Sequence, residues 1–230
     1  MKRLLLILLC LPFIGVGQSI TIIPDPNFEQ RLISFGYDNG PVNGYVYTND
    51  INAIDMLDVS SCNISDLTGI EGFSGLEYLY CFDNQLTSLD VSSNTILVYL
   101  SCEQNQFTTL DLSQNYYLYS LQCRYGQLTS LDLRNGNNTN MSSPDVFGNP
   151  NLTCINVDDS TWSTTNWTTN ISPPLYFSNN CSPPSTIQEH SINKELLKAT
   201  DLLGRETKQT NQPLFYIYDD GTVEKRIVIE

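Results

Sequence analysis

Residues 76–133 decide the fold: LEYLYCFDNQLTSLDVSSNTI (76–96) is followed by LVYLSCEQNQFTTLDLSQNYY (97–117) and LYSLQCRYGQLTSLDL (118–133). Placed under one another at a spacing of 21, the three segments agree position by position. The clearest equivalent positions are Leu79, Leu100 and Leu121, then Cys81, Cys102 and Cys123. A fixed period of this length predicts a solenoid, in which each repeat buries its apolar side only against its neighbours.

The repeated pattern L-x-x-L-x-C-x-x-N-x-L resembles the leucine-rich repeat family, with cysteine in the third apolar position. Asn84 and Asn105 fill the asparagine position, and Gly126 replaces asparagine in the third copy. The resemblance implies a leucine-rich-repeat solenoid over residues 53–157. Its parallel strands would line a concave face, and short strands or irregular segments would form the convex side.

A degenerate first repeat precedes these three copies. Leu57 and Val59 match Leu79 and Cys81 at a spacing of 22. The segment ISDLTGIEGFSGL (64–76) resembles the repeats of internalins, which are bacterial surface proteins. This repeat would place one more strand beside residues 76–96.

Residues 18–52 are predicted to form an N-terminal cap with a short helix. Asp25 suits the position before a helix, where its carboxylate accepts backbone N–H groups, and Gly36 suits the helix end. The helix face expected to pack against the first repeat consists of Phe28, Leu32 and Phe35. Residues 158–181 are predicted to cap the other end with Trp162, Trp167, Tyr176 and Phe177.

Residues 1–17 have the features of a secretory signal peptide. Lys2 and Arg3 form a positive region, the following residues are almost wholly apolar, and Gly17 is a small residue at the expected cleavage point. The apolar stretch is too short for a membrane span, and no other stretch has the length and hydropathy of one. The sequence therefore predicts a secreted or cell-surface protein that leaves the cytoplasm by the Sec route.

The chain is strongly acidic, with a net charge of −14. Residues 32–181 hold fifteen acidic side chains and only two basic ones, Arg124 and Arg134. Such a surface repels nucleic acid and anionic lipid, so we expect neither as a partner. Two interpretations stay open: the charge serves solubility, or it attracts cations or a basic partner.

Six cysteines follow the predicted signal peptide, and their positions favour two different roles. Residues one repeat apart lie on adjacent parallel strands about 4.8 Å apart with parallel Cβ vectors, which suits a disulfide poorly. Cys81, Cys102 and Cys123 are therefore predicted to form a buried ladder of free thiols. Cys154 and Cys181 bracket the aromatic cap, and we predict a disulfide between them. Cys62 has no assigned partner.

The sequence does not favour an enzyme. Its single histidine, His190, lies beyond the repeats, which excludes Ser-His-Asp and Cys-His chemistry from them. Asp90, Asp111 and Asp132 recur once per repeat, as expected of a solvated structural position. A calcium-binding stripe and acid–base hydrolysis by paired carboxylates are the alternatives. No cofactor and no metal site are predicted.

Residues 182–193 read as a linker, and residues 194–230 as a separate small β segment with three strands near 196–203, 214–218 and 223–229. The segment resembles the C-terminal sorting domain of the type IX secretion system of Bacteroidetes. Its matching residues include Asp201, Gly204, Arg205, Asp220, Gly221 and Lys225. The resemblance implies recognition by that machinery, export across the outer membrane, and release or attachment at the cell surface. An ordinary small β domain is the alternative.

The residues that alternate with the buried leucines and cysteines should point out of the concave strand face. These candidate binding residues are Tyr78, Tyr80, Phe82, Tyr99, Ser101, Glu103, Gln122 and Arg124. Exposed aromatic patches commonly mark interaction sites, so we predict an adhesion module for a protein or glycan ligand. Two alternatives remain: the aromatics only stabilise neighbouring strands, and the protein is structural with no discrete ligand.

Overall fold

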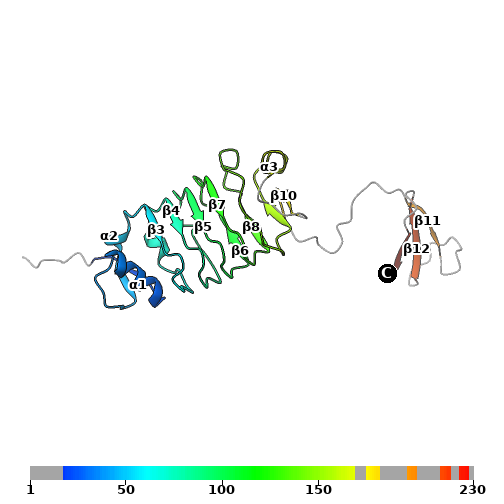
Figure 1. The fold of residues 1–230 in the computed structure, drawn as a ribbon. Coiled ribbons are helices and arrows are strands. Elements are labelled where there is room, and N and C mark those ends of the chain that lie inside the picture. The colour runs from blue at the N-terminus through cyan, green and yellow to red at the C-terminus, as the bar shows by residue number, and fades with distance from the viewer. Residues whose placement is uncertain (1–17, 169–174, 182–195, 201–212, 219–222, 228–230) are drawn as a thin grey trace, which may run out of the picture. The chain divides into compact units, whose positions relative to one another are not determined.

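The computed structural model describes residues 18–168 and 175–181, together with the backbone of three strands in the C-terminal segment (Figure 1). The chain divides between Cys181 and Ser182 into two compact units. The predicted signal peptide lies outside the described residues. Within the described residues, no helix is long and apolar enough to cross a membrane.

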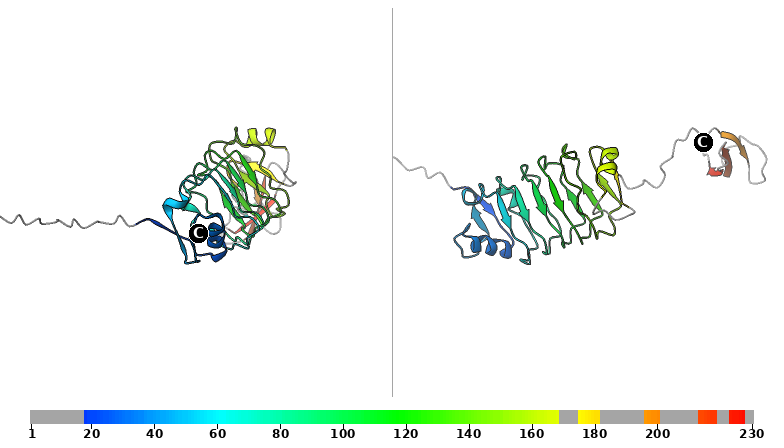
Figure 2. Two further views of the ribbon diagram at one scale, coloured as in Figure 1. Left: turned by 60° about the vertical axis from the view of Figure 1, so that its left-hand side comes forward. Right: turned by 45° about the horizontal axis from the view of Figure 1, so that its top comes forward.

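The repeats form a parallel β-solenoid, which confirms the predicted fold class. Its first sheet contains β3 (Met56–Asp58), β4 (Tyr78–Tyr80), β5 (Tyr99–Ser101) and β7 (Ser120–Gln122), in that order (Figure 2). Adjacent strands are parallel, and the register aligns Leu57, Leu79, Leu100 and Leu121. The central leucine of every strand is buried, so both flanking residues lie on the outer face. The spacings of 22 and 21 predicted this register.

A second parallel sheet covers the other side of the solenoid. It contains β6 (Thr109–Asp111), β8 (Ser130–Asp132), β9 (Cys154–Asn156) and β10 (Tyr176–Ser178), in the order β6-β8-β9-β10. Each of these strands is three residues long, as expected for the convex side. Leu110, Leu131 and Ile155 point inward and are buried. The core therefore lies between the two sheets and continues from one coil to the next.

The repeat after Leu133 is enlarged, as its loosened pattern indicated. Asp145 forms a parallel bridge with Gln122, so this coil advances by 23 residues rather than 21 and still continues the first sheet. Val146 is buried in the position that follows Cys123 along the stack. At the other end Val59 precedes Cys81 and is also buried. Valine thus replaces cysteine at both ends of the column, which is consistent with a packing role for the three thiols.

A column of buried asparagines closes the turn after β4, after β5 and after the bridge at Asp145. The side-chain amide of Asn105 donates to the carbonyl oxygens of Cys81 (2.9 Å) and Cys102 (3.2 Å), and its oxygen accepts from the backbone N of Leu86 (3.1 Å). Asn84 makes the equivalent bonds one coil earlier. These bonds join backbone groups of neighbouring coils, in addition to backbone hydrogen bonds at the same turn such as that from Asp83 N to the carbonyl of Glu103.

Gly126 interrupts this column for a steric reason. A Cβ atom at Gly126 would lie 2.8 Å from the side-chain oxygen of Asn149, closer than real Cβ contacts allow. Asn149 occupies that space because it accepts from the backbone N of Leu128 (3.0 Å) and donates to the carbonyl of Cys123 (2.8 Å). The absence of a side chain at Gly126 in the third repeat therefore leaves room for the Asn149 side chain of the enlarged fourth repeat.

A second asparagine column, which the sequence analysis did not identify, closes the opposite turn. The side-chain amide of Asn94 donates to the carbonyls of Ile70 and Phe73, both at 3.0 Å. Asn115 donates to the carbonyls of Val91 and Asn94, again at 3.0 Å. Both asparagines are fully buried. Each coil is thus fixed to the preceding one at two points outside its sheets.

The N-terminal cap consists of β1 (Ile20–Ile22) paired antiparallel with β2 (Tyr45–Tyr47), α1 (Pro26–Phe35) and α2 (Thr48–Ile51). A short 3-10 turn, η1 (Ile70–Gly72), lies between β3 and β4 in the first repeat. Phe28 and Leu32 are buried against the first repeat, as predicted. The expectation for Phe35 is wrong: its ring is 39% exposed and lies 4.3 Å from the Arg31 guanidinium. Phe35 contacts Tyr37 instead, with ring centroids 5.4 Å apart.

Asp25 joins this cap to the first repeat. One carboxylate oxygen accepts from the backbone N of Phe28, and the other accepts from the backbone N and hydroxyl of Ser65, both at 2.8 Å. Burial raises the pKa of Asp25, but the hydrogen bonds from Ser65, Phe28 and Asn27 outweigh it and hold the pKa below its ordinary value. The carboxylate is therefore a helix cap and a link between two elements.

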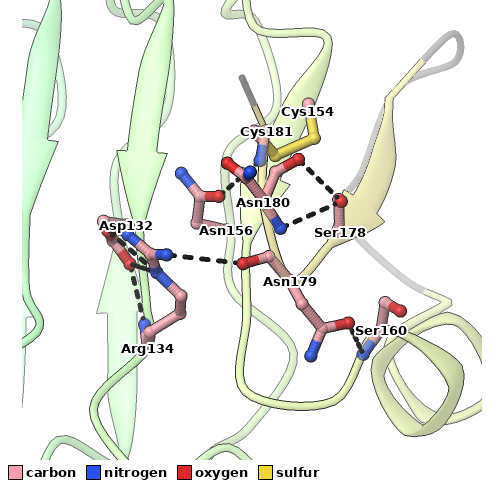
Figure 3. Close-up of a disulfide and its surroundings, with 9 residues drawn as sticks. All are labelled: Asp132, Arg134, Cys154, Asn156, Ser160, Ser178, Asn179, Asn180 and Cys181. Atoms are coloured by element: carbon pink, nitrogen blue, oxygen red, sulfur yellow. Dashed lines mark hydrogen bonds and ion pairs between the residues drawn. A yellow bond between two sulfur atoms is a disulfide. The ribbon is translucent and has the colours of Figure 1, made fainter.

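The C-terminal cap is built on α3 (Ser160–Asn166) and an aromatic cluster. Trp167 is buried, contacts Trp162 and Phe177 edge to face, and donates its indole N–H to the carbonyl of Met141 (3.3 Å). Tyr176 differs from the prediction for this cap because 54% of its side chain is exposed. A disulfide joins Cys154 in β9 to Cys181 just after β10, and the backbone N of Cys181 donates to the Asn156 side chain (Figure 3).

The ladder cysteines are free and buried. Cys81, Cys102 and Cys123 are each at most 1% exposed, and none of them is bonded to another cysteine. Burial raises the pKa of Cys81 and of Cys102 well above the ordinary thiol value. Both groups are therefore uncharged thiols near neutral pH. Cys62 is free and partly exposed.

The second unit contains an antiparallel three-stranded sheet of β11 (Leu196–Thr200), β12 (Pro213–Tyr218) and β13 (Val223–Ile227). Three strands were expected here at similar positions. The connection that holds Asp220 and Gly221 lies outside the described residues, as do Asp201, Gly204 and Arg205. Lys225 lies in β13 opposite Phe215 in the register.

Replacing Asn105 by alanine tests the first asparagine column. The variant removes four hydrogen bonds and leaves buried backbone groups without partners. Because one unsatisfied buried group costs about 1–3 kcal/mol, we expect a loss of roughly 3 kcal/mol in the free energy of unfolding, measured by urea denaturation. The control is Gln106→Ala, an exposed neighbour, with a change below about 0.5 kcal/mol. Equal effects of the two variants would contradict the assigned role of the column.

Mass spectrometry of a non-reduced digest tests the cysteine assignments. We expect one linked peptide pair, Cys154 with Cys181, and free thiols at Cys81, Cys102 and Cys123. The disulfide closes a loop with a sequence separation of 27, so reduction should lower stability by about 3–4 kcal/mol in the chain-entropy model. A peptide that links two ladder cysteines would show that the ladder assignment is wrong.

Candidate functional site

The outer face of the first sheet presents three rows of side chains that run across the strands. One row consists of Met56, Tyr78, Tyr99 and Ser120. The next row consists of Asp58, Tyr80, Ser101, Gln122 and Asp145. Phe82, Glu103 and Arg124 follow, each one residue beyond a ladder cysteine. All eight predicted binding residues lie in this grid, which we call the aromatic face.

An open, shallow depression of about 440 Å³ lies in the middle of the aromatic face. Its lining consists of Tyr80, Phe82, Tyr99, Ser101, Glu103, Gln104, Gln122, Arg124 and Tyr125. Seven of the eight predicted binding residues are among them. Tyr78 is the exception, because it is half-buried beside the depression and does not line it. Gln104 and Tyr125 are lining residues that were not among the predicted eight.

Two tyrosines form one wall of the depression. The ring centroids of Tyr80 and Tyr99 are 5.1 Å apart, and the ring planes are tilted by 37°. The residues belong to adjacent strands but are not directly opposite each other, because Tyr80 pairs with Ser101 and Tyr99 with Tyr78. The contact is diagonal across the sheet, and both rings keep part of their surface exposed.

Glu103 is held at the floor of the depression by a short chain of hydroxyl groups. The hydroxyl of Ser101 donates to the Glu103 carboxylate at 2.6 Å. Burial, the negative charge of Glu103 and the neighbouring Tyr80 raise the pKa of Tyr99, while a hydrogen bond with Ser101 opposes the rise. Ser101, one of the predicted binding residues, lines the depression, but only 3% of it is exposed. Its role in the structure is to orient Glu103.

Arg124 is paired with Asp145 on the next strand. The guanidinium donates to one carboxylate oxygen of Asp145, which is buried, while the Arg124 side chain is 45% exposed. The hydrogen bond and the charge of Asp145 raise the pKa of Arg124. Asp145 could not be predicted at this place, because the enlarged repeat displaces it by two residues from the regular period.

Tyr125 reaches the depression through an unusual backbone conformation. Its φ is +52°, and the equivalent positions Asp83 and Gln104 have φ of +54°. An aromatic residue is unfavourable in this left-handed region, and the next coil has Gly148 there with φ of +79°. Tyr125 contacts Phe147 edge to face at 5.8 Å. The left-handed conformation recurs at this position in the neighbouring coils, so it belongs to the turn of the repeat, and from there Tyr125 lines the depression.

The aspartates that recur once per repeat act as turn residues. Each accepts, through one carboxylate oxygen, from the backbone N two residues ahead: Asp90 from Ser92, Asp111 from Ser113, and Asp132 from Arg134. Hydrogen bonds from Ser92 lower the pKa of Asp90. Among the described residues, no group of three acidic, cysteine or histidine side chains is arranged to hold a metal ion. The calcium hypothesis therefore gains no support from this geometry.

A second group of exposed aromatics lies beside the aromatic face and was missed. Tyr117 and Tyr119 are 64% and 58% exposed, and Tyr119 directly precedes β7. The signal was present in the sequence, since the equivalent positions one repeat earlier are Ile96 and Val98. Tyr117 and Tyr119 precede the strand, so the alternation along the strand does not include them among the predicted binding residues.

Comparison with known proteins finds likeness in solved structures alone, since no protein-family model and no curated protein matches the chain. The functional domain of InlJ from Listeria monocytogenes, described as including a cysteine ladder, is 24% identical, with a TM-score of 0.47 over 60% of this chain and 38% of that one. The Listeria internalin InlF is 19% identical, with a TM-score of 0.43 over 60% of this chain and 52% of that one. Internalin C2 from Listeria monocytogenes is 16% identical, with a TM-score of 0.27 over 68% of this chain and 95% of that one.

The chain thus spans about two fifths of the InlJ domain and about half of InlF. At these identities and TM-scores the likeness adds nothing about ligands. The function proposed below rests on the structure of this chain.

Proposed function

We propose that the protein is a binding module that holds an extracellular protein or a glycan on its aromatic face. The observation that carries this proposal is the difference between the two sheets of one solenoid. The first sheet presents Tyr78, Tyr80 and Tyr99 outward, whereas the outward residues of β6 and β8 are Thr109, Asp111, Ser130 and Asp132. The second sheet has one outward aromatic residue, Tyr176 in its last strand β10, so the cluster of tyrosines on the first sheet calls for a separate explanation.

Strand packing alone accounts poorly for these aromatics. The parallel strands are already held by their ladders, by the inward leucines and by two asparagine columns. Small polar residues suffice in β6 and β8, which pair with the same three-residue register. The Tyr80–Tyr99 contact adds roughly 0.5–1.5 kcal/mol, but it leaves Phe82 and Tyr125 unexplained. A recognition role accounts for all four rings together.

Localisation belongs to the same proposal. The apolar leader at residues 1–17 and the acidic composition fit a protein that is secreted or displayed at the cell surface. The motifs of residues 194–230, together with the separate three-stranded sheet, support a sorting signal read by type IX secretion machinery. In this proposal the second unit is an address, and the solenoid carries the binding function without catalysis.

Serine substitutions at Tyr80, Phe82 and Tyr99 test the binding face. We expect the triple variant to lose binding on an extracellular-protein array or a glycan array while its melting temperature falls by only a few degrees, since about 1 kcal/mol corresponds to roughly 2–4 °C at this size. The matched control replaces Tyr47 and Tyr176, two exposed tyrosines outside the depression, and should keep every ligand. A destabilised triple variant that still binds its ligand would contradict the proposal.

Deleting residues 194–230 tests the sorting function. The truncated protein should unfold at the same urea concentration as the full chain, because the solenoid forms its own compact unit, yet it should stay in the periplasm of the native host. Fusion of the same residues to a periplasmic reporter should carry that reporter across the outer membrane. Secretion of the truncated protein into the medium would refute the assignment.

A further inference from the structure

We infer that the depression in the aromatic face receives a cationic side chain, a lysine or arginine, from a basic segment of a protein partner. The inference rests on the proposed binding function and names the chemistry of the ligand. Three observations carry it: a carboxylate in no ion pair, aromatic rings beside it, and a nearby arginine whose ion pair is with a different carboxylate.

The carboxylate is Glu103. Among the described residues the ion pairs are Arg124 with Asp145 and Arg134 with Asp132, so Glu103 has no cation of its own. The hydroxyl of Ser101 holds one of its oxygens at 2.6 Å. The carboxylate is thus oriented in a surface depression and has no cation within ion-pair distance among the described residues. A preorganised carboxylate of this kind binds a donor cation with less loss of side-chain entropy than a free one.

The aromatic rings supply the second half of a cation site. Tyr80 and Tyr99 line the same depression as Glu103, with centroids 5.1 Å apart. A cation is attracted to an aromatic face within about 6 Å of the ring centroid, and the attraction grows as water is excluded. Phe82 and Tyr125 add further ring surface to the lining. An ammonium or guanidinium group placed here would meet the carboxylate and at least one ring together.

Arg124 does not oppose this arrangement. Its guanidinium is turned to Asp145, a buried carboxylate on the neighbouring strand. The charge of Arg124 also acts on Glu103, but this one cation faces two carboxylates, Asp145 and Glu103, so the group keeps a net negative charge. A cation that enters the depression therefore meets a negative local field.

The charge of the solenoid favours a basic protein segment over a neutral glycan. Residues 32–181 hold fifteen acidic and two basic side chains, and both basic ones are engaged in ion pairs. A surface of this sign accelerates encounter with a basic partner and repels an acidic one. A neutral sugar would use the rings but gain nothing from the acidic surface.

Choline provides the direct test, because 3,3-dimethylbutan-1-ol is its neutral isostere. We expect nuclear magnetic resonance titration of the full protein to show choline shifting the Tyr80 and Tyr99 ring signals with roughly tenfold higher affinity than the alcohol. The peptide acetyl-Gly-Lys-Gly-amide should likewise bind more tightly than acetyl-Gly-Gln-Gly-amide. Equal affinities within both pairs would overturn the inference.

A matched pair of charge variants separates the specific site from general attraction. Glu103→Gln should weaken the lysine peptide about fivefold, whereas Asp55→Asn should leave its affinity almost unchanged. Asp55 is exposed and does not line the depression, and its replacement by asparagine removes the same single charge as Glu103→Gln. Equal weakening by both variants would mean that only the net charge attracts the peptide, and the site would be refuted.

The array experiment separates failure of this inference from failure of the proposed function. Ligands that need Tyr80, Phe82 and Tyr99 but bind Glu103→Gln as well as the parent protein would preserve the binding function and refute the cation site. Ligands that lose affinity in both variants and carry basic segments would support it. If no ligand on the arrays depends on Tyr80, Phe82 and Tyr99, the proposed binding function is refuted, whatever the result of the choline titration.

Discussion

The structure depends on the hydrogen bonding of the backbone where each coil turns between its two sheets. Strands of three residues leave many peptide groups without a ladder partner, and buried groups of this kind are costly. Two columns of buried asparagines, which include Asn84 and Asn105 at one turn and Asn94 and Asn115 at the other, provide the missing bonds. Because each amide joins adjacent coils, the same bonds keep the strands in register and the outward residues in rows.

The period of 21 was enough to predict the solenoid and the register of its first sheet. It was also enough to separate inward from outward residues, because alternation along a strand leaves no other choice once the leucines are buried. The helix between Asp25 and Gly36 followed from local capping chemistry. The prediction failed where the period broke: Asp145 lies two residues out of step, so its pairing with Arg124 could not be inferred. Asn94 and Asn115 kept the period, but their polar character masked their burial.

The depression itself could not be predicted from the sequence, because it depends on how deep each side chain lies. Ser101 and Tyr99 belong to one strand, yet the first is covered and the second is half-exposed. Tyr78 has the same chemistry as Tyr80 and falls outside the depression. Tyr125 enters it through a left-handed backbone that tyrosine rarely adopts. The alternation along the strands therefore predicts which residues point outward, but the local geometry decides which of them line the depression.

The position of the disulfide has a consequence for how the solenoid comes apart. A stack of coils with nearest-neighbour contacts opens from its ends, where one interface holds the terminal coil. Cys154 and Cys181 join the last two strands of the second sheet covalently, whereas the first coil is held by noncovalent contacts such as those of Asp25. Unfolding of the stack therefore starts at the N-terminal coil, and the coil with Gln122 and Arg124 stays folded longer than the coil with Tyr78 and Tyr80.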